Sequence, residues 1–390
     1  MKQNLVTEKA LQILQQKKSD FAEEKKKDAL ESFNAIPMPK EKEEEWRYTS
    51  IDKFKLDSYV AEEPKTIISV LSEELGEGVV ITDINSALDK YPACQNYLFR
   101  STDFKKDKFI AFNASHFNNG VFIYVPKNIE VTVPIRLKFD SEGKTGIIHN
   151  LIVAEANSKV DIIEEYSGNA SFNSCVTEVY ANHNAKVNFN HLNNFNKDAY
   201  SFTNITGALE RNAYVNWISG CFGGRINRLK IDTIFVGQGS SATNLGIFMG
   251  KGKEHLDFTT NMYHNAENTT NDVLVDGIMK DESSSVYRGL IRIPKEGQKT
   301  NSYLANHILK LGDKTLANSI PSLKIDANDV KASHGATVGQ INDEHLFYLM
   351  ARGLSKEEAQ NLIVEGFFEP IIQKIPSEEV REKIRELVRK

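Results

Sequence analysis

The 390-residue sequence predicts a mainly β protein whose strands wind into a β-solenoid. Between about residues 105 and 335, short segments alternate apolar and polar residues, as at 159–163 and 186–190. Alternation with a period of two is the pattern of a strand with one buried face. Fourteen asparagines lie between residues 150 and 217. Asn tolerates left-handed turns and can stack in hydrogen-bonded ladders, so its abundance fits many short turns between stacked strands.

A repeat supports the solenoid. A three-residue pattern ending in a β-branched residue recurs at 158–160, 185–187, 213–215 and 241–243, at spacings of 27, 28 and 28 residues. A steady period of this size without helices predicts coils that each bury one face on the next. We therefore expect Val160, Val187, Val215 and Thr243 to occupy equivalent positions. A β-sandwich would give no steady period, and a propeller blade would need about 40–50 residues.

The N-terminal part has a different texture. Residues 7–33 contain no Gly or Pro and are rich in Glu, Lys, Ala and Leu, which predicts a solvated helix that ends before Pro37. In the segment that follows, we expect Trp46 and Tyr48 to anchor the chain on the domain behind it. Residues 64–100 predict a small mixed α/β segment. The predicted domains are residues 1–104, 105–335 and 336–390.

The C-terminal part returns to helix. An amphipathic helix is predicted at 343–350, and Arg352-Gly353 is a suitable C-terminal stop for it. Ser355 and Glu358 form a predicted capping box at the start of the next helix, and a charged helix follows Pro376. Because a solenoid end exposes unpaired strand edges, we expect these helices to cap that end, to bind a partner, or both.

Composition narrows the function. A net charge of −5 argues against broad nucleic-acid binding. No apolar run reaches the ~20 residues of a membrane span, and the first residues form no signal core, so a cytoplasmic location is the expectation. Cys94, Cys175 and Cys221 are odd in number and far apart, which fits reduced thiols and no self-contained zinc or cluster site. The P-loop pattern is missing from the sequence, so we expect no ATP binding of that kind.

Two groups of residues could ligate a metal. His255, Asp257 and His264 are close in sequence, but ordinary surface or core histidines are the favoured interpretation. His334 lies near the end of the predicted solenoid, and imidazole is a suitable ligand for iron and can replace a thiolate in a cluster. The alternative for His334 is a hydrogen-bonded histidine that holds the first C-terminal helix in place.

Six ordered blocks between residues 286 and 354 carry a family resemblance. They read VYRGL (286–290), QKTNSY (298–303), SIPSL (319–323), NDVKASHGAT (328–337), LFYL (346–349) and ARGL (351–354). In this order they resemble the SufB/SufD family of iron–sulfur cluster assembly proteins. EEWRYT at 44–49 resembles a block near the start of the SufD branch.

The resemblance implies a right-handed parallel β-helix between helical N- and C-terminal domains. It implies a non-catalytic scaffold that pairs with a SufB-type homologue and binds the SufC-type ABC ATPase, with a homodimer possible for the isolated chain. The complex would build a nascent iron–sulfur cluster at the heteromeric interface. The resemblance implies no cofactor held stably by the isolated chain, and reduced flavin only for the whole complex.

Three departures refine the resemblance. Asn306 stands where SufB-type chains carry a Cys, and Gly335 stands where they carry a Glu; both favour the SufD branch. Ala332 replaces a Cys of many SufD-like chains, so His334 has no neighbouring thiol. The candidate cluster-assembly or interface residues are therefore His334, Ser333 and Asn306, with His334 as the candidate metal ligand.

A second candidate surface is expected to bind the ATPase subunit. It consists of aromatic, apolar and Arg anchors in the C-terminal helices: Phe347, Tyr348, Arg352, Leu354, Phe367 and Phe368. Deleting residues 341–390 is expected to remove ATPase binding and leave the β-helix folded. Two rival classes stay open: a β-helix enzyme acting on polysaccharides, and a structural solenoid without cluster chemistry. Spacing identifies no nucleophile–base pair, so we expect no enzymatic activity.

Overall fold

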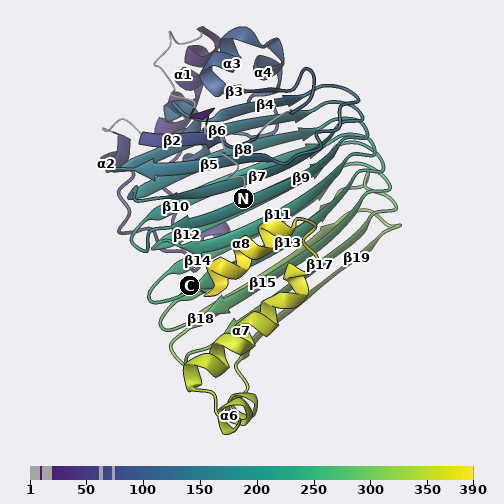
Figure 1. Cartoon of the computed structure of the whole chain (residues 1–390). Helices are drawn as coiled ribbons and strands as arrows, with labels where there is room; N and C mark the ends of the chain where they lie inside the picture. The colour runs from purple at the N-terminus through teal and green to yellow at the C-terminus, as the bar shows by residue number, and fades with distance from the viewer. Residues whose placement is uncertain (1–8, 11–19, 61–64, 73–74, 390) are drawn as a thin grey trace, which may run out of the picture.

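The computed structural model describes residues 9–10, 20–60, 65–72 and 75–389, and shows a parallel β-solenoid flanked by helices, as the sequence predicts (Figure 1). From β4 onward, successive strands alternate between two sheets, so each coil contributes one strand to each sheet. From β6 onward every strand is ten residues long. Side chains on the inward faces of the two sheets form the main core, in which Trp217 and Tyr287 are fully buried.

The ten-stranded sheet contains, in order, β1 (Lys9–Ala10), β2 (Lys65–Val70), β5 (Ile135–Glu142), β7 (Lys159–Gly168), β9 (Lys186–Phe195), β11 (Tyr214–Gly223), β13 (Ser241–Gly250), β15 (Thr270–Met279), β17 (Asn301–Lys310) and β19 (Lys331–Gln340). The nine-stranded sheet contains, in order, β3 (Val80–Asp83), β4 (Val121–Val125), β6 (Thr145–Ala154), β8 (Phe172–Ala181), β10 (Tyr200–Leu209), β12 (Ile226–Phe235), β14 (His255–His264), β16 (Ser284–Ile293) and β18 (Leu316–Ile325).

The predicted repeat is correct for three of its four members. Val160 pairs with Val187, and Val187 pairs with Val215, so these valines occupy one column of the core. The fourth member is wrong by one residue, because Val215 pairs with Ala242, and Thr243 lies on the outer face opposite Asn216. Later coils lengthen only in their turns, such as the one between β16 and β17, while the strands keep their length. The spacing of the repeat in the sequence therefore varies, although the paired strands keep their length.

Asparagines make the turns between coils, as predicted. Asn128, Asn157, Asn184, Asn212 and Asn268 all have positive φ, between 56° and 63°. They form part of a ladder, since the side chain of Asn184 donates to Asn157 and that of Asn157 donates to Asn128, each at 2.8 Å. Asn is the non-glycine residue best suited to this conformation, so it tightens each turn and links it to the turn below.

The N-terminal segment packs on the outer face of the nine-stranded sheet. Its helices are α1 (Asp20–Ala35), α2 (Asp57–Val60), α3 (Ile84–Lys90), α4 (Pro92–Tyr97) and α5 (Lys108–His116), with a 3₁₀ turn at Glu44–Trp46. Phe109 and Phe112 of α5 pack with Phe172 and Phe202 of the sheet in one aromatic cluster. The helix predicted from residue 7 is wrong at Lys9–Ala10, which form the short strand β1, and residues 11–19 lie outside the described part.

The C-terminal helices are α6 (Asp343–Ala351), α7 (Lys356–Ile372) and α8 (Glu378–Arg389). The capping box at Ser355 and Glu358 is present, and Gly353 adopts a φ of +98° after α6. The expectation that these helices cap the solenoid end is wrong. α7 and α8 lie across the outer face of the ten-stranded sheet, where Phe368 and Ile384 pack on Ile218 and Leu245 (Figure 1).

His264 gives a test of the buried core. Its ring stacks on Phe235, with centroids 4.4 Å apart, and its Nδ1 and Nε2 lie within hydrogen-bond distance of Thr269 and Asn271. Burial lowers the pKa of His264 to about 4, from 6.5 for a free histidine, because the charged ring loses its hydration. The unfolded chain therefore takes up a proton first, so stability is complete above about pH 6.5 and falls as the pH drops toward 4.

We predict that this site alone costs about 2 kcal/mol of stability between pH 7 and pH 5. His264→Gln, which keeps a donor for Asn271 but cannot be protonated, should remove that part of the pH dependence. Urea unfolding of both proteins at the two pH values measures it. An unchanged pH slope in the variant would contradict the assignment.

Candidate functional site

The solenoid ends in an open coil at its C-terminal side. β18 and β19 are the last strands of the two sheets, and within the described residues each pairs with a strand on one side only. Leu323 and Val338 continue core columns through Ile291 and Ile308, yet Val338 is 44% exposed. Pro321 lies in the middle of β18, and Pro fits a sheet mainly at an edge because it has no N–H. The end therefore offers both strand edges and apolar core side chains.

His334 lies in this open end. It is on β19 in register with the core residue Leu304, so it belongs to the inward-facing column of the last coil. The residue is exposed, and the structure gives its ring no hydrogen-bond partner among the described residues. The alternative of a hydrogen-bonded histidine that holds α6 is therefore wrong. No three His, Cys, Asp or Glu side chains of the described residues are grouped as metal ligands.

The two other candidate interface residues differ from each other. Asn306 is fully buried, its Nδ2 donates to the Val275 carbonyl, and its Oδ1 accepts from Ser319, both at 2.7 Å. Its assignment to an accessible interface is wrong, because both amide atoms are paired inside the solenoid. Ser333 is exposed on the outer face, in register with Tyr303.

The three cysteines are buried free thiols. Burial raises the pKa of the Cys221 thiol to about 12, and it raises the pKa values of Cys94 and Cys175 further. The thiolate is the form that binds metals, and a thiol with a raised pKa stays protonated at neutral pH. The chain therefore presents an accessible imidazole and no accessible thiolate.

The residues predicted to bind an ATPase divide into two groups. Phe347 and Tyr348 are 73% and 57% exposed on α6, and Arg352 donates to the Tyr348 hydroxyl at 2.8 Å. Leu354 and Phe367 are half-buried. Phe368 is fully buried on the side of α7 that packs against the ten-stranded sheet, so its assignment to a docking surface is wrong. Neighbouring helical residues point about 100° apart, which turns one phenylalanine toward the sheet and the other toward the edge of the helix.

The N-terminal EEWRYT block is held on the outer face of the nine-stranded sheet. Trp46 is 5% exposed, packs against Phe109, and lies under the guanidinium of Arg228 at 3.9 Å. Its predicted role as an anchor is confirmed. Tyr48 is not an anchor, because it is 48% exposed and its backbone has a φ of +72°. The second anchor is Thr49, which is fully buried.

Thr49 reaches a buried charge cluster. Its hydroxyl donates to Asp257 Oδ2 at 2.6 Å, and Arg288 donates to Asp257 Oδ1 at 2.8 Å. Arg288 also donates to the carbonyl oxygen of Arg47. Sequence analysis missed this contact because the partners lie more than 200 residues apart and Asp257 stands in an ordinary alternating strand.

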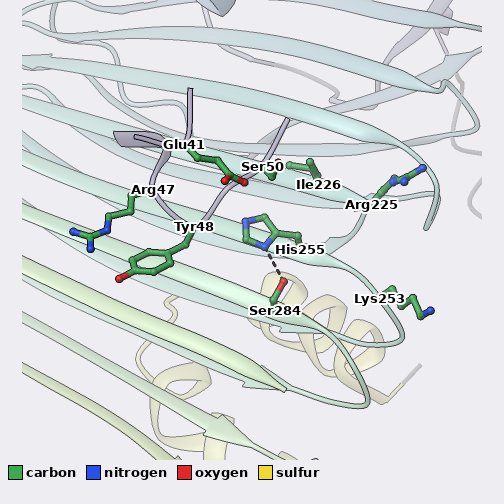
Figure 2. A pocket seen from close by; sticks show the side chains of 9 residues that line it. All are labelled: Glu41, Arg47, Tyr48, Ser50, Arg225, Ile226, Lys253, His255 and Ser284. Atoms are coloured by element: carbon green, nitrogen blue, oxygen red, sulfur yellow. Dashed lines mark hydrogen bonds between the residues drawn. The ribbon is translucent and has the colours of Figure 1, made fainter. Parts of the chain in front are cut away.

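A cavity of about 500 Å³ lies between this block and the sheet (Figure 2). Its floor contains His255, whose Nε2 lies 3.0 Å from the Thr49 hydroxyl and whose Nδ1 lies 2.8 Å from the Ser284 hydroxyl. The Thr49 proton goes to Asp257, so His255 Nε2–H must donate to Thr49. Burial lowers the pKa of His255, so the ring is neutral and its Nδ1 accepts from Ser284.

These positions exclude the metal site considered for His255, Asp257 and His264. His255 and Asp257 face outward under the N-terminal block, whereas His264 lies at the other end of β14 and points into the core. Asp257 is already bonded to Thr49 and Arg288. The interpretation of these residues as ordinary packed side chains is the one that the structure supports.

The fold and its open end define a parallel β-solenoid protein with free strand edges at one end. Residues 138–367 match the family described as "SUF system FeS cluster assembly, SufBD core domain", and residues 57–137 match "SufBD protein N-terminal region". The chain belongs to the SufBD family, which confirms the resemblance seen in the ordered blocks.

Curated relatives agree with this assignment. The chain is 30% identical to the iron–sulfur cluster assembly protein SufD of Bacillus subtilis (strain 168) over 396 aligned positions, covering 91% of this chain and 90% of the relative. It is 28% identical to an iron–sulfur cluster assembly SufBD family protein of Staphylococcus saprophyticus and 29% identical to one of Staphylococcus aureus (strain MRSA252). Both alignments cover 81% of this chain and 70% of the relative.

Because His334 is exposed and Asn306 is buried, replacing each by Ala should lower stability by different amounts. His334→Ala should change the free energy of unfolding by less than about 0.5 kcal/mol, because the ring is exposed and makes no hydrogen bond within the described residues. Asn306→Ala should cost roughly 1–3 kcal/mol, because it leaves the Val275 carbonyl and the Ser319 hydroxyl unpaired in the interior. Urea unfolding compares them, and an equal loss in the His334 variant would show that His334 is a structural residue.

Proposed function

We propose that this chain is a SufD-type scaffold subunit that pairs with a SufB-type homologue through β18 and β19. The observation that carries the proposal is the open end, where two strand edges have no partner among the described residues and surround exposed Leu323, Ile325 and Val338. An exposed edge is a template for strand pairing. The likeness to a protein named SufD supports the choice of branch.

A second solenoid with an open end of the same kind is the partner that fits best. Such a partner would continue both ladders and bury the apolar side chains at the end of the core. A second copy of this chain offers the same chemistry, so a homodimer is the expected form when the homologue is absent. In the heteromer, each chain can contribute different residues to the shared interface.

The nascent iron–sulfur cluster is the cargo of this interface in our proposal. His334 would supply an imidazole from this chain, and the thiolates would come from the partner, since the cysteines of this chain are buried. The cluster yield of an assembled complex carrying His334→Ala tests this role. A lower yield in an intact complex supports it, and a normal yield eliminates it.

We assign the ATPase contact to α6 and the turn that follows it. Phe347 and Tyr348 are exposed together on a short helix whose ends are fixed by Asn342 and Gly353. Exposed aromatic residues beside an Arg are the usual anchors of a protein interface. An ATPase that docks here would supply the nucleotide chemistry. In our proposal this chain acts as a scaffold and not as an enzyme, and it does so in the cytoplasm.

Family membership is the reason to prefer cluster assembly over the two rival classes. A polysaccharide-active β-helix and a structural solenoid without cluster chemistry would share the coil architecture, but neither accounts for the ordered family blocks. No helix of the described residues is long and apolar enough to cross a membrane.

Charged substitutions at the open end should weaken pairing with the homologue without unfolding the chain. Leu323→Glu combined with Val338→Glu should weaken the complex with the SufB-type homologue by more than about a hundredfold, because two charges would be buried without partners. The fold should survive, since both side chains are already partly exposed. Val236→Glu, in an exposed turn far from the end, is the matched control. Size-exclusion chromatography of the mixed proteins measures complex formation. A double variant that pairs as tightly as the wild type would contradict the proposal.

The ATPase contact has its own test. Phe347→Ala combined with Tyr348→Ala should abolish capture of the SufC-type ATPase without unfolding the chain, because both rings are exposed. Tyr48→Ala removes a ring that is 48% exposed in the N-terminal block, and this variant should capture the ATPase normally. Point variants are needed because deleting residues 341–390, expected from sequence to leave the β-helix folded, would uncover Ile218 and Leu245 under α7 and α8. Normal capture by the double variant would refute the assignment.

A further inference from the structure

The cavity beside the EEWRYT block has no role in the proposed pairing or ATPase contact. Its walls come from three places: the N-terminal segment at Arg47 and Ser50, the turn between β11 and β12 at Arg225, and the turn between β13 and β14 at Lys253. Its volume of about 500 Å³ is in the range of small-molecule sites. The two turns belong to neighbouring coils, where the backbone N–H of His255 donates to the Arg225 carbonyl at 3.1 Å, and the N-terminal segment joins them through its packing on the sheet.

Charge is unbalanced around the cavity. Arg47, Arg225 and Lys253 line it with a single carboxylate, Glu41. Lys253 lies 3.6 Å from Glu282, but within the described residues neither arginine has a carboxylate partner. The two guanidinium groups lie near aromatic rings, with the Tyr48 ring 5.3 Å from Arg47 and the Tyr200 ring 5.7 Å from Arg225.

The neighbouring arginines behave differently. Arg228 and Arg288 are buried and share Asp257, and Arg228 also lies 3.8 Å from Glu45, so both guanidinium groups have carboxylate partners within the fold. Arg47 and Arg225 are exposed on opposite sides of His255 (Figure 2). Their side chains point away from His255 in opposite directions, so a ligand seated between them requires a change of rotamer, which is common on binding.

The backbone at Tyr48 is strained in a way that the packing of its own ring does not explain. A bulky residue at φ +72° is unusual, and here the ring remains 48% exposed on the rim. The conformation is fixed from both sides, by buried Trp46 and by buried Thr49. Strain of this kind clusters at binding sites, where the surrounding structure holds a side chain in a required position.

The hydrogen-bond donors on the cavity floor already have acceptors within the protein. His255 Nε2–H donates to Thr49, and Ser284 donates to His255, so neither group has a proton left for a ligand. Recognition must come from the rim, where the donors are guanidinium and ammonium groups. Planar guanidinium groups bind phosphate oxygens in pairs, which selects an oxyanion over a neutral molecule.

We propose that this cavity binds a small phosphate-bearing anion, held between Arg47 and Arg225 with Lys253 at the edge. The site is independent of the open end and of α6, so it does not require a partner chain. Ligand binding would tie the N-terminal block to two successive turns of the solenoid.

Titration calorimetry of the full chain with inorganic pyrophosphate at low salt tests the proposal. Arg47→Ala and Arg225→Ala should each weaken binding by about tenfold, the loss of one charge-assisted contact, and the double variant should show no binding. Raising the salt concentration should weaken binding by the wild-type chain. Both variants should keep the wild-type unfolding midpoint, because these side chains are exposed and lack carboxylate partners among the described residues.

Arg211→Ala is the matched control, because Arg211 is also exposed and lies in a turn, between β10 and β11, at the opposite edge of the sheets. It should bind pyrophosphate as tightly as the wild type. Absence of binding by the wild-type chain up to about 1 mM, or equal weakening by Arg211→Ala and Arg225→Ala, would overturn the proposal.

Discussion

In a parallel solenoid each coil satisfies its backbone groups on the coils above and below, and this requirement governs the whole molecule. At the N-terminal end the ladders finish in short antiparallel strands, β1 and β2 in one sheet and β3 in the other. At the C-terminal end β18 and β19 have no further strand among the described residues. A buried backbone group without a partner is costly, so the last coil is stable either in water or against another chain.

The outer faces leave few other surfaces free. The N-terminal helices pack on the nine-stranded sheet, and α7 and α8 pack on the ten-stranded sheet. What remains accessible and apolar is therefore concentrated at the open end and on α6, next to each other in chain order. This arrangement separates a strand-edge surface, suited to a second solenoid, from an aromatic helix surface, suited to a different partner. His334 stands on the first surface, where a shared site can form.

The sequence pattern correctly predicted features that depend mainly on residues close together in the chain. Alternation placed Val160, Val187 and Val215 in one column, and Asn abundance predicted the left-handed turns. The slip at Thr243 arose because the equivalent triplet, Ser240-Ser241-Ala242, ends in Ala and not in a β-branched residue. The pattern therefore selected Ser241-Ala242-Thr243, one residue later, and the pairing of Val215 with Ala242 corrects it. The position of α7 and α8 could not be read from their own amphipathicity. The apolar residues Ile218 and Leu245 at outward positions were the available sign that the sheet is covered.

Long-range contacts set the remaining limit. Trp46 could be recognised as an anchor, but its neighbour Tyr48 could not be told apart from it, because exposure depends on a turn conformation fixed by Thr49 and Asp257. Asn306 lies two residues from the partner of His334 on the neighbouring strand, yet Asn306 is buried and His334 is exposed. The difference arises because β17 has a neighbour on both sides and β19 does not.

Hydrogen–deuterium exchange tests most directly the claim that the open coil is completed by another chain. Amide exchange is measured on this chain alone and after addition of the SufB-type homologue. We predict that peptides covering β18 and β19 become strongly protected in the complex, since their free backbone groups enter a ladder, while α6 stays unchanged until the ATPase is added. Unchanged exchange in β18 and β19 upon stable complex formation would contradict the account.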